Sequence, residues 1–130
     1  MTKFDEAIAQ IDSANALDPN TEIFEGDPFP KEVLYSQRMT VWMDRLSPDA
    51  PEFMKIAARA QHICRWEIPR KDYPKGKKGY HHWRTTLYRH HADKAAEIML
   101  NCGYDKGTTE KMRQLLLRRK LRSSADMQTL

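Results

Sequence analysis

The chain has 130 residues, a net charge of +4 and a mean hydropathy of −0.79. This length suits a single domain, spanning residues 1–130, whose core needs neither a disulfide nor a metal ion for stability. No apolar run approaches the ~18 residues of a membrane-spanning helix, and the start of the chain lacks the basic and then apolar pattern of a signal peptide. We therefore expect a cytoplasmic protein without a membrane partner.

The net charge conceals a strong asymmetry between the two halves of the chain. Residues 1–64 contain 6 basic and 11 acidic side chains (net −5), whereas residues 65–130 contain 16 basic and 7 acidic side chains (net +9). An anionic partner would therefore meet the second half. The alternative is that the opposite charges of the two halves complement one another when the halves pack together.

Helical periodicity recurs along the chain, and no segment alternates apolar and polar residues as a strand would. Pro, Gly and Asp-rich breakers separate five predicted helices, over residues 2–17, 30–46, 51–66, 80–102 and 108–120. Residues 122–130 form a polar tail. The sequence thus predicts an all-α fold of about five helices.

The apolar stripes of these helices identify the candidate core. The second helix would bury Trp42 and Leu46, and the fifth would bury Met112, Leu115 and Leu116. Gly103 is placed to end the fourth helix in a left-handed conformation. The two cysteines, Cys64 and Cys102, fall within helical apolar patterns and are interpreted as small buried hydrophobes.

Histidines are the first candidates for chemistry. His91 lies at the centre of the fourth helix's apolar stripe, so it should point inward, either as a hydrogen-bonded core residue or as a ligand. At ~100° per residue, His62 falls almost opposite the apolar face of the third helix. It is therefore either exposed or part of a helix that is buried on both sides.

The second candidate is a basic segment, residues 65–89, in which aromatic residues alternate with cations. Its cations are Arg65, Arg70, Lys71, Lys75, Lys77, Lys78, Arg84 and Arg89, and its aromatics are Trp66, Tyr73, Tyr80, Trp83 and Tyr88. Cations together with aromatic rings suit phosphate binding and base stacking. The alternative is a solvated charged loop whose rings pack inward. Just beyond it, Lys94 could either extend to solvent or hold a phosphate near His91.

Two resemblances follow from particular motifs. The stretches Ala60–Ile63, Arg65–Arg70 and Leu87–Ala95 (AQHI, RWEIPR and LYRHHADKA) resemble a family of small helical proteins known only as a domain of unknown function. The order of the helices also resembles the HD superfamily of metal-dependent phosphohydrolases. This second resemblance implies an orthogonal helical bundle, from which a C-terminal helix would be missing because the chain ends at Leu130.

The chain departs from the HD ligand set at most positions. Tyr35 stands where the first metal-binding histidine is expected, and Gln61-His62 replaces the His-Asp doublet. Arg118 or Arg119 replaces a later histidine. Two metal ions of the HD type therefore cannot be assembled, although one divalent metal on His62 and His91 stays open. Arginines in place of ligands favour direct binding of an anion.

The sequence thus predicts an HD-like domain that binds a phosphate-bearing small molecule such as a nucleotide, either a phosphohydrolase or a degenerate relative. His62 and His91 would be the catalytic residues, between the third and fourth helices. The anion-binding residues would be Arg65, Arg70, Arg89, Lys94 and Arg119. The alternative is an RNA-binding or protein-interaction module that uses the basic segment.

Overall fold

The computed structural model describes residues 2–118, and its architecture is all-α with one short hairpin, which confirms the predicted class. Five helices dominate it: α1 (Lys3–Asn15), α2 (Lys31–Leu46), α3 (Glu52–Arg59), α4 (Lys77–Asn101) and α5 (Lys106–Leu116). The hairpin, β1 (Thr21–Phe24) and β2 (Asp27–Pro30), joins α1 to α2. Two single-turn 3-10 helices, η1 (Arg65–Glu67) and η2 (Arg70–Asp72), precede α4.

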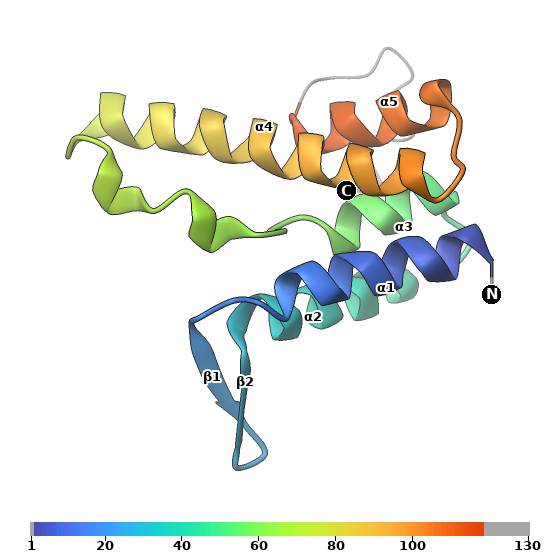
Figure 1. Ribbon diagram of the computed structural model, residues 1–130, viewed down its shortest axis with the longest axis horizontal. Coiled ribbons are helices and arrows are strands. Elements are labelled where there is room, and N and C mark those ends of the chain that lie inside the picture. Colours follow the sequence, from blue (N-terminus) through green and yellow to red (C-terminus); the bar gives the residue numbers. More distant parts are fainter. Residues whose placement is uncertain (1, 119–130) are drawn as a thin grey trace.

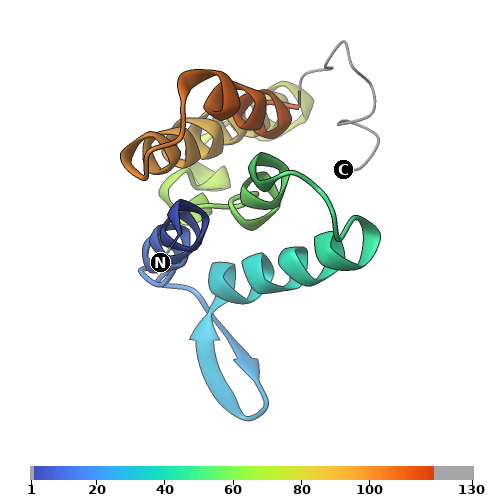
Figure 2. The same cartoon turned by 90° about the vertical axis from the view of Figure 1, so that its right-hand side faces the viewer.

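The short helix α3 lies at the centre of the molecule. It lies between the α4–α5 pair on one side and the α1–α2 pair on the other (Figures 1 and 2). Ile56 and Ala60 of this region are fully buried, as are Ala92 and Ala95 of α4. Because alanine side chains are small, α4 can approach this core closely.

The hairpin corrects the expectation of a loop before α2. Glu25 and Gly26 have φ angles of 51° and 88°, and they connect paired residues Phe24 and Asp27. Two positive φ angles in a two-residue connection make a tight turn whose twist matches that of the flanking strands. The hairpin carries no clear sequence signal because Glu is rare at the first of these positions, and the prolines of β2 weaken its strand pattern.

The predicted buried face of α2 is wrong in part. Trp42 and Leu46 are 55% and 69% exposed, while Leu34 and Met43 are buried instead. Two polar side chains, Glu32 and Ser36, are buried with them, and this is why the apolar stripe indicated the wrong side of the helix. For residues 2–118, no helix has the length and apolar character needed to cross a membrane.

The third predicted helix ends seven residues early, at Arg59. Cys64 has a φ of 53°, in the left-handed region, so the chain turns sharply between Ala60 and η1. Side chains from other helices bind the backbone here: Asn15 Oδ1 accepts from Cys64 N–H at 3.0 Å, and His91 Nδ1 lies 2.8 Å from Ile63 O. These tertiary hydrogen bonds replace those of a continuing helix.

The last two helices agree with the sequence patterns, although α4 begins at Lys77 and α5 at Lys106, three and two residues before their predicted starts. Gly103 has a φ of 99° directly after α4, and Tyr104 N–H donates to Met99 O at 3.0 Å, as expected for a glycine-terminated helix. Asp105 begins α5 by accepting a hydrogen bond from Thr108 N–H. Met112, Leu115 and Leu116 are buried as predicted. The predicted end of this helix and the polar tail lie outside the described residues.

Candidate functional site

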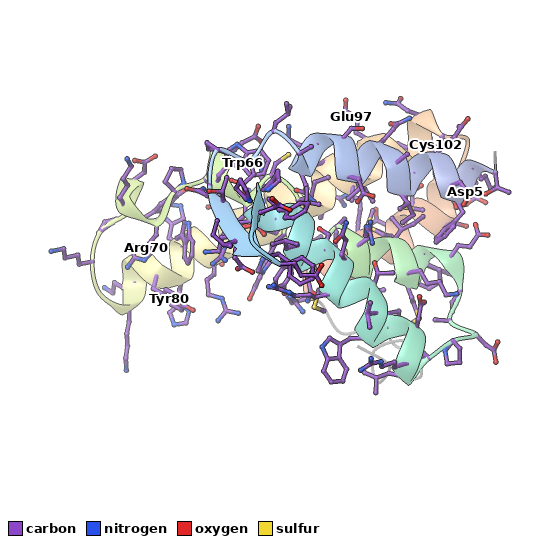
Figure 3. All side chains as sticks on the ribbon, turned by 90° about the horizontal axis from the view of Figure 1, so that it is seen from below. Asp5, Trp66, Arg70, Tyr80, Glu97 and Cys102 are labelled. Carbon is purple, nitrogen blue, oxygen red and sulfur yellow. The ribbon has the colours of Figure 1, made fainter. Side chains whose placement is uncertain are left out.

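A cavity of about 220 Å³ opens between the turn after α3, the first half of α4 and the end of α5. Its lining residues are Gln61, His62, Arg65, Tyr80, Trp83, Arg84, Leu87, Tyr88, His91 and Arg118. Figure 3 shows Tyr80 and Arg70 near the start of α4, while Glu97 and Cys102 belong to its opposite end. The cavity therefore belongs to the half of α4 that the basic segment approaches.

Positive charge dominates the lining of this cavity. Three arginines, Arg65, Arg84 and Arg118, contribute to it, and no carboxylate does so among the described residues. Elsewhere three arginines are paired, Arg38 with Glu22, Arg59 with Asp12, and Arg113 with Asp93 and Glu110, whereas Arg45, Arg70 and Arg89 have no ion pair among the described residues. Within residues 2–118, the three cavity arginines form no such ion pair. The cavity therefore concentrates uncompensated positive charge.

Aromatic rings hold these guanidinium groups in place. Arg65 lies over Trp83 with 5.4 Å between the guanidinium carbon and the ring centre, and Arg118 lies over Tyr88 at 5.3 Å. Arg84 lies over Tyr80 and Tyr88 and donates to the Tyr88 hydroxyl. A guanidinium that stacks on a ring keeps its N–H edge available for a ligand.

Two further contacts fix the walls of the cavity. With its amide oxygen toward Arg118, Gln61 accepts from the two terminal nitrogens of that guanidinium at 2.8 and 3.3 Å. Trp83 Nε1–H donates to Ile68 O at 2.7 Å, so the basic segment is tied to α4. The walls therefore come from segments distant in sequence that hydrogen bonds hold together.

His91 is buried and neutral. Its side chain is on α4, and Nδ1–H donates to the carbonyl oxygen of Ile63 at 2.8 Å. Burial is the main cause that lowers the pKa of His91 to about 3, because the charged imidazolium would lose its hydration. Nε2 is then an unprotonated acceptor at neutral pH. His91 can accept a hydrogen bond from a ligand, but it does not supply positive charge.

His62 lies beside His91, with 6.1 Å between the two ring centres. Its ring stacks on Tyr35 of α2 at 3.7 Å and 5°, and its Nδ1 lies 3.3 Å from Glu32 Oε1. Burial is the main cause that raises the pKa of Tyr35, so this hydroxyl stays neutral. The imidazole of His62 is thus oriented from the α2 side, and His62 also lines the cavity.

Asn15 fixes the turn that carries His62. Its Nδ2–H donates to Ser36 Oγ at 3.0 Å, and its Oδ1 accepts from Cys64 N–H. Asn15 is fully buried, so both hydrogen bonds are shielded from water. Together with the bond between His91 and Ile63, they hold the turn between α1, α2 and α4.

The sequence-predicted site residues divide into two groups. His62, His91 and Arg65 line the same cavity. Arg70 instead donates to the carbonyl oxygens of Tyr73 and Pro74 and stabilises its own loop. Lys94 pairs with Glu67, which His90 also contacts, and Arg89 is exposed outside the cavity lining. Arg119 lies outside the described residues.

The sequence reasoning did not select three residues that matter here. Arg84 was one cation among many in the basic segment, and Arg118 was an alternative to Arg119 in the HD comparison. Helical spacing could have found Arg84, because it lies seven residues before His91 and therefore on nearly the same face. Glu32 carried no signal, since a carboxylate in the first turn of a helix is common.

The residues do not fit the metal centre that the HD resemblance implies. Among residues 2–118, no group of three or more His, Cys, Asp or Glu side chains is arranged to hold a metal ion. His62 and His91 alone would provide two ligands, fewer than the three or four protein ligands usual for a divalent metal held by imidazoles. We therefore derive no chemistry through a metal ion.

The family described as "Domain of unknown function (DUF4202)" matches residues 5–130. No curated protein and no solved structure is similar enough to match.

Proposed function

We propose that this chain, which belongs to the DUF4202 family, binds a phosphate-bearing small molecule such as a nucleotide in the cavity between the turn after α3 and α4. The observation that carries the proposal is the convergence of Arg65, Arg84 and Arg118 without a carboxylate beside them. Guanidinium groups bind phosphate oxygens through parallel N–H donors, and such charge-assisted bonds are stronger than neutral ones.

The size of the cavity suits the phosphate part of a ligand and not a whole nucleotide. At about 220 Å³ it is smaller than the 300–1,000 Å³ typical of sites that enclose a whole drug-sized ligand. A phosphate or pyrophosphate group would occupy the space between the arginines. A base would lie toward the rim, where the side chain of Tyr80, over whose ring Arg84 lies, is 40% exposed.

A thermal-shift screen tests this proposal. Phosphate, pyrophosphate and a panel of nucleotides would be added to the wild-type chain and to Arg84→Gln, with Arg89→Gln as the matched control. Both variants remove one arginine from α4, but only Arg84 lines the cavity. We expect ligands that raise the Tm of the wild type and of Arg89→Gln, and a much smaller rise for Arg84→Gln. A flat response of the wild type across the panel would reject the proposal.

The alternative partner is single-stranded RNA. Its support is the series of stacked side chains Tyr80, Arg84 and Tyr88 on α4, of which Tyr80 and Arg84 are exposed, close to the exposed Lys75, Lys77 and Lys78. Exchange of these three lysines for alanine would weaken salt-dependent RNA binding. It would leave pyrophosphate binding unchanged, because none of the three lines the cavity.

A further inference from the structure

Glu32 is the least compensated buried carboxylate among the described residues. Its side chain is 7% exposed, and Oε1 is the one buried side-chain polar atom of residues 2–118 without a hydrogen bond. Burial of a charged group without partners is costly, so such a group needs an explanation. A role in capping α2 does not explain the buried Glu32 side chain, because the start of that helix is capped by Asp18, whose Oδ2 accepts from Glu32 N–H at 3.0 Å.

The nearest polar group to this orphan oxygen is His62. Nδ1 of His62 lies 3.3 Å from Oε1, which is close enough for an ion pair but not aligned as a hydrogen bond. The stacking on Tyr35 fixes the plane of the imidazole, and the same side chain lines the cavity. In space, His62 therefore lies between the buried carboxylate of Glu32 and the proposed phosphate site.

We propose that Glu32 and His62 form a proton-accepting pair that hydrolyses a phosphate ester bound in the cavity, an inference that rests on the proposed function. Glu32 is the positioning residue: its negative charge, 3.3 Å from Nδ1 of His62, favours a proton on Nδ1 and leaves Nε2 unprotonated. Nε2 is the catalytic atom, and it takes a proton from a water molecule beside the bound phosphate.

The step balances without a metal ion or a redox partner. The water oxygen forms a bond to phosphorus, and the bond from phosphorus to the ester oxygen breaks. One proton of the water goes to His62 Nε2, the other stays on the oxygen that is now bonded to phosphorus, and the leaving oxygen takes up a proton from solvent to become an alcohol. The imidazolium then returns its proton to solvent. Arg65, Arg84 and Arg118 stabilise the charge that develops on the phosphate oxygens.

His91 is not the base in this scheme. Its Nδ1–H is used by Ile63 O, and its depressed pKa of about 3 makes Nε2 a weak proton acceptor. Its place beside His62 suits it to accept a hydrogen bond from the attacking water or from the ligand. The two histidines thus have different functions, which their different partners determine.

Two substitutions separate the parts of the pair. His62→Asn keeps a donor near the position of Nδ1 but lacks any atom at the position of Nε2. Glu32→Gln keeps the shape of the side chain but removes its charge. Glu97→Gln, at an exposed carboxylate on α4 outside the cavity lining, is the matched control. Pyrophosphate binding of each variant reports whether its cavity is intact.

The experiment measures phosphate release from p-nitrophenyl phosphate and from a nucleotide panel in EDTA. We expect release by the wild type and Glu97→Gln, loss of at least 100-fold in kcat for His62→Asn, and at least 10-fold for Glu32→Gln with KM little changed. In ¹⁵N NMR spectra, His62 of the wild type should carry its proton on Nδ1, and Glu32→Gln should shift this tautomer balance.

The outcomes distinguish this inference from the proposed function. If the wild type binds pyrophosphate but releases no phosphate, or if His62→Asn is as active as the wild type, the proton-accepting pair is rejected and the binding site stands. A neutral His62 protonated on Nε2 in the wild type would also overturn the pair. If pyrophosphate does not bind the wild type, the proposed function fails, and this inference fails with it.

Discussion

The side-chain oxygen of Asn15 accepts a hydrogen bond from the backbone N–H of Cys64 at 3.0 Å, across 49 positions of the sequence. This bond, with the one from Asn15 to Ser36, fixes the turn that presents His62 to the cavity. Stability and site geometry therefore depend on the same buried amide.

Asn15→Ala should destabilise the fold substantially. It leaves the Cys64 N–H and the Ser36 hydroxyl without partners in a buried place, and we expect a loss of about 3 kcal/mol in the free energy of unfolding. Urea denaturation measures this loss. Asn101→Ala, at an exposed position that ends α4, is the control and should change stability by less than about 1 kcal/mol. Equal effects of the two substitutions would contradict the role of Asn15.

Gly79→Ala should displace the basic segment from α4. A Cβ atom at Gly79 would overlap the carbonyl oxygen of Pro74, which is backbone and cannot move alone. We expect a lower Tm and a change in Trp83 fluorescence, because the Trp83 indole N–H donates a hydrogen bond to the carbonyl oxygen of Ile68 in the same segment. Gly107→Ala adds the same methyl group in α5, where the nearest atom is 3.4 Å away. It should be neutral or stabilise by up to about 1 kcal/mol. A Gly79→Ala protein as stable as Gly107→Ala would show that the segment does not need this close contact.

The neutral His91 predicts a specific dependence of stability on pH. Its pKa is about 3 in the folded chain and near the usual ~6.5 in the unfolded chain. As the pH falls, the unfolded chain therefore binds the proton first. The contribution of neutral His91 to the free energy of unfolding is complete above pH ~6.5 and is lost as the pH falls toward about 3. Between pH 7 and pH 5 this single group should lower the free energy of unfolding by about 2 kcal/mol.

His91→Asn isolates this contribution, because asparagine can still donate to Ile63 O but does not titrate. The stability difference between the wild type and His91→Asn should change by about 2 kcal/mol between pH 7 and pH 5, in the direction that penalises the wild type at low pH. A difference that stays constant across this range would mean that His91 is not held neutral.

The sequence was informative where local rules decide the structure. Helical periodicity predicted five helices, and the end of α4 at Gly103 follows from the one residue type that adopts a positive φ without strain. The inward orientation of His91 also followed from its place in an apolar stripe. These features need only neighbours within a few residues.

Tertiary contacts decided the features that the sequence did not predict. The third helix ends at Arg59 because Asn15 and His91, from other helices, bind the backbone that follows. His62 therefore leaves the helical geometry on which its predicted direction depended. The contact between Glu32 and His62 joins residues 30 positions apart, and no local pattern indicates it.

The most direct test of the central claim is a titration of pyrophosphate into two double variants by isothermal titration calorimetry. Arg65→Gln/Arg84→Gln and Arg89→Gln/Lys94→Gln each remove two positive charges from the basic half of the chain, but only the first pair lines the cavity. We expect the first double variant to lose at least 100-fold in affinity, because each charged hydrogen bond to the anion contributes about 1.5–3 kcal/mol. The affinity of the second double variant should stay within about threefold of the wild type. Equal losses in both variants would mean that net charge, and not this cavity, attracts the anion.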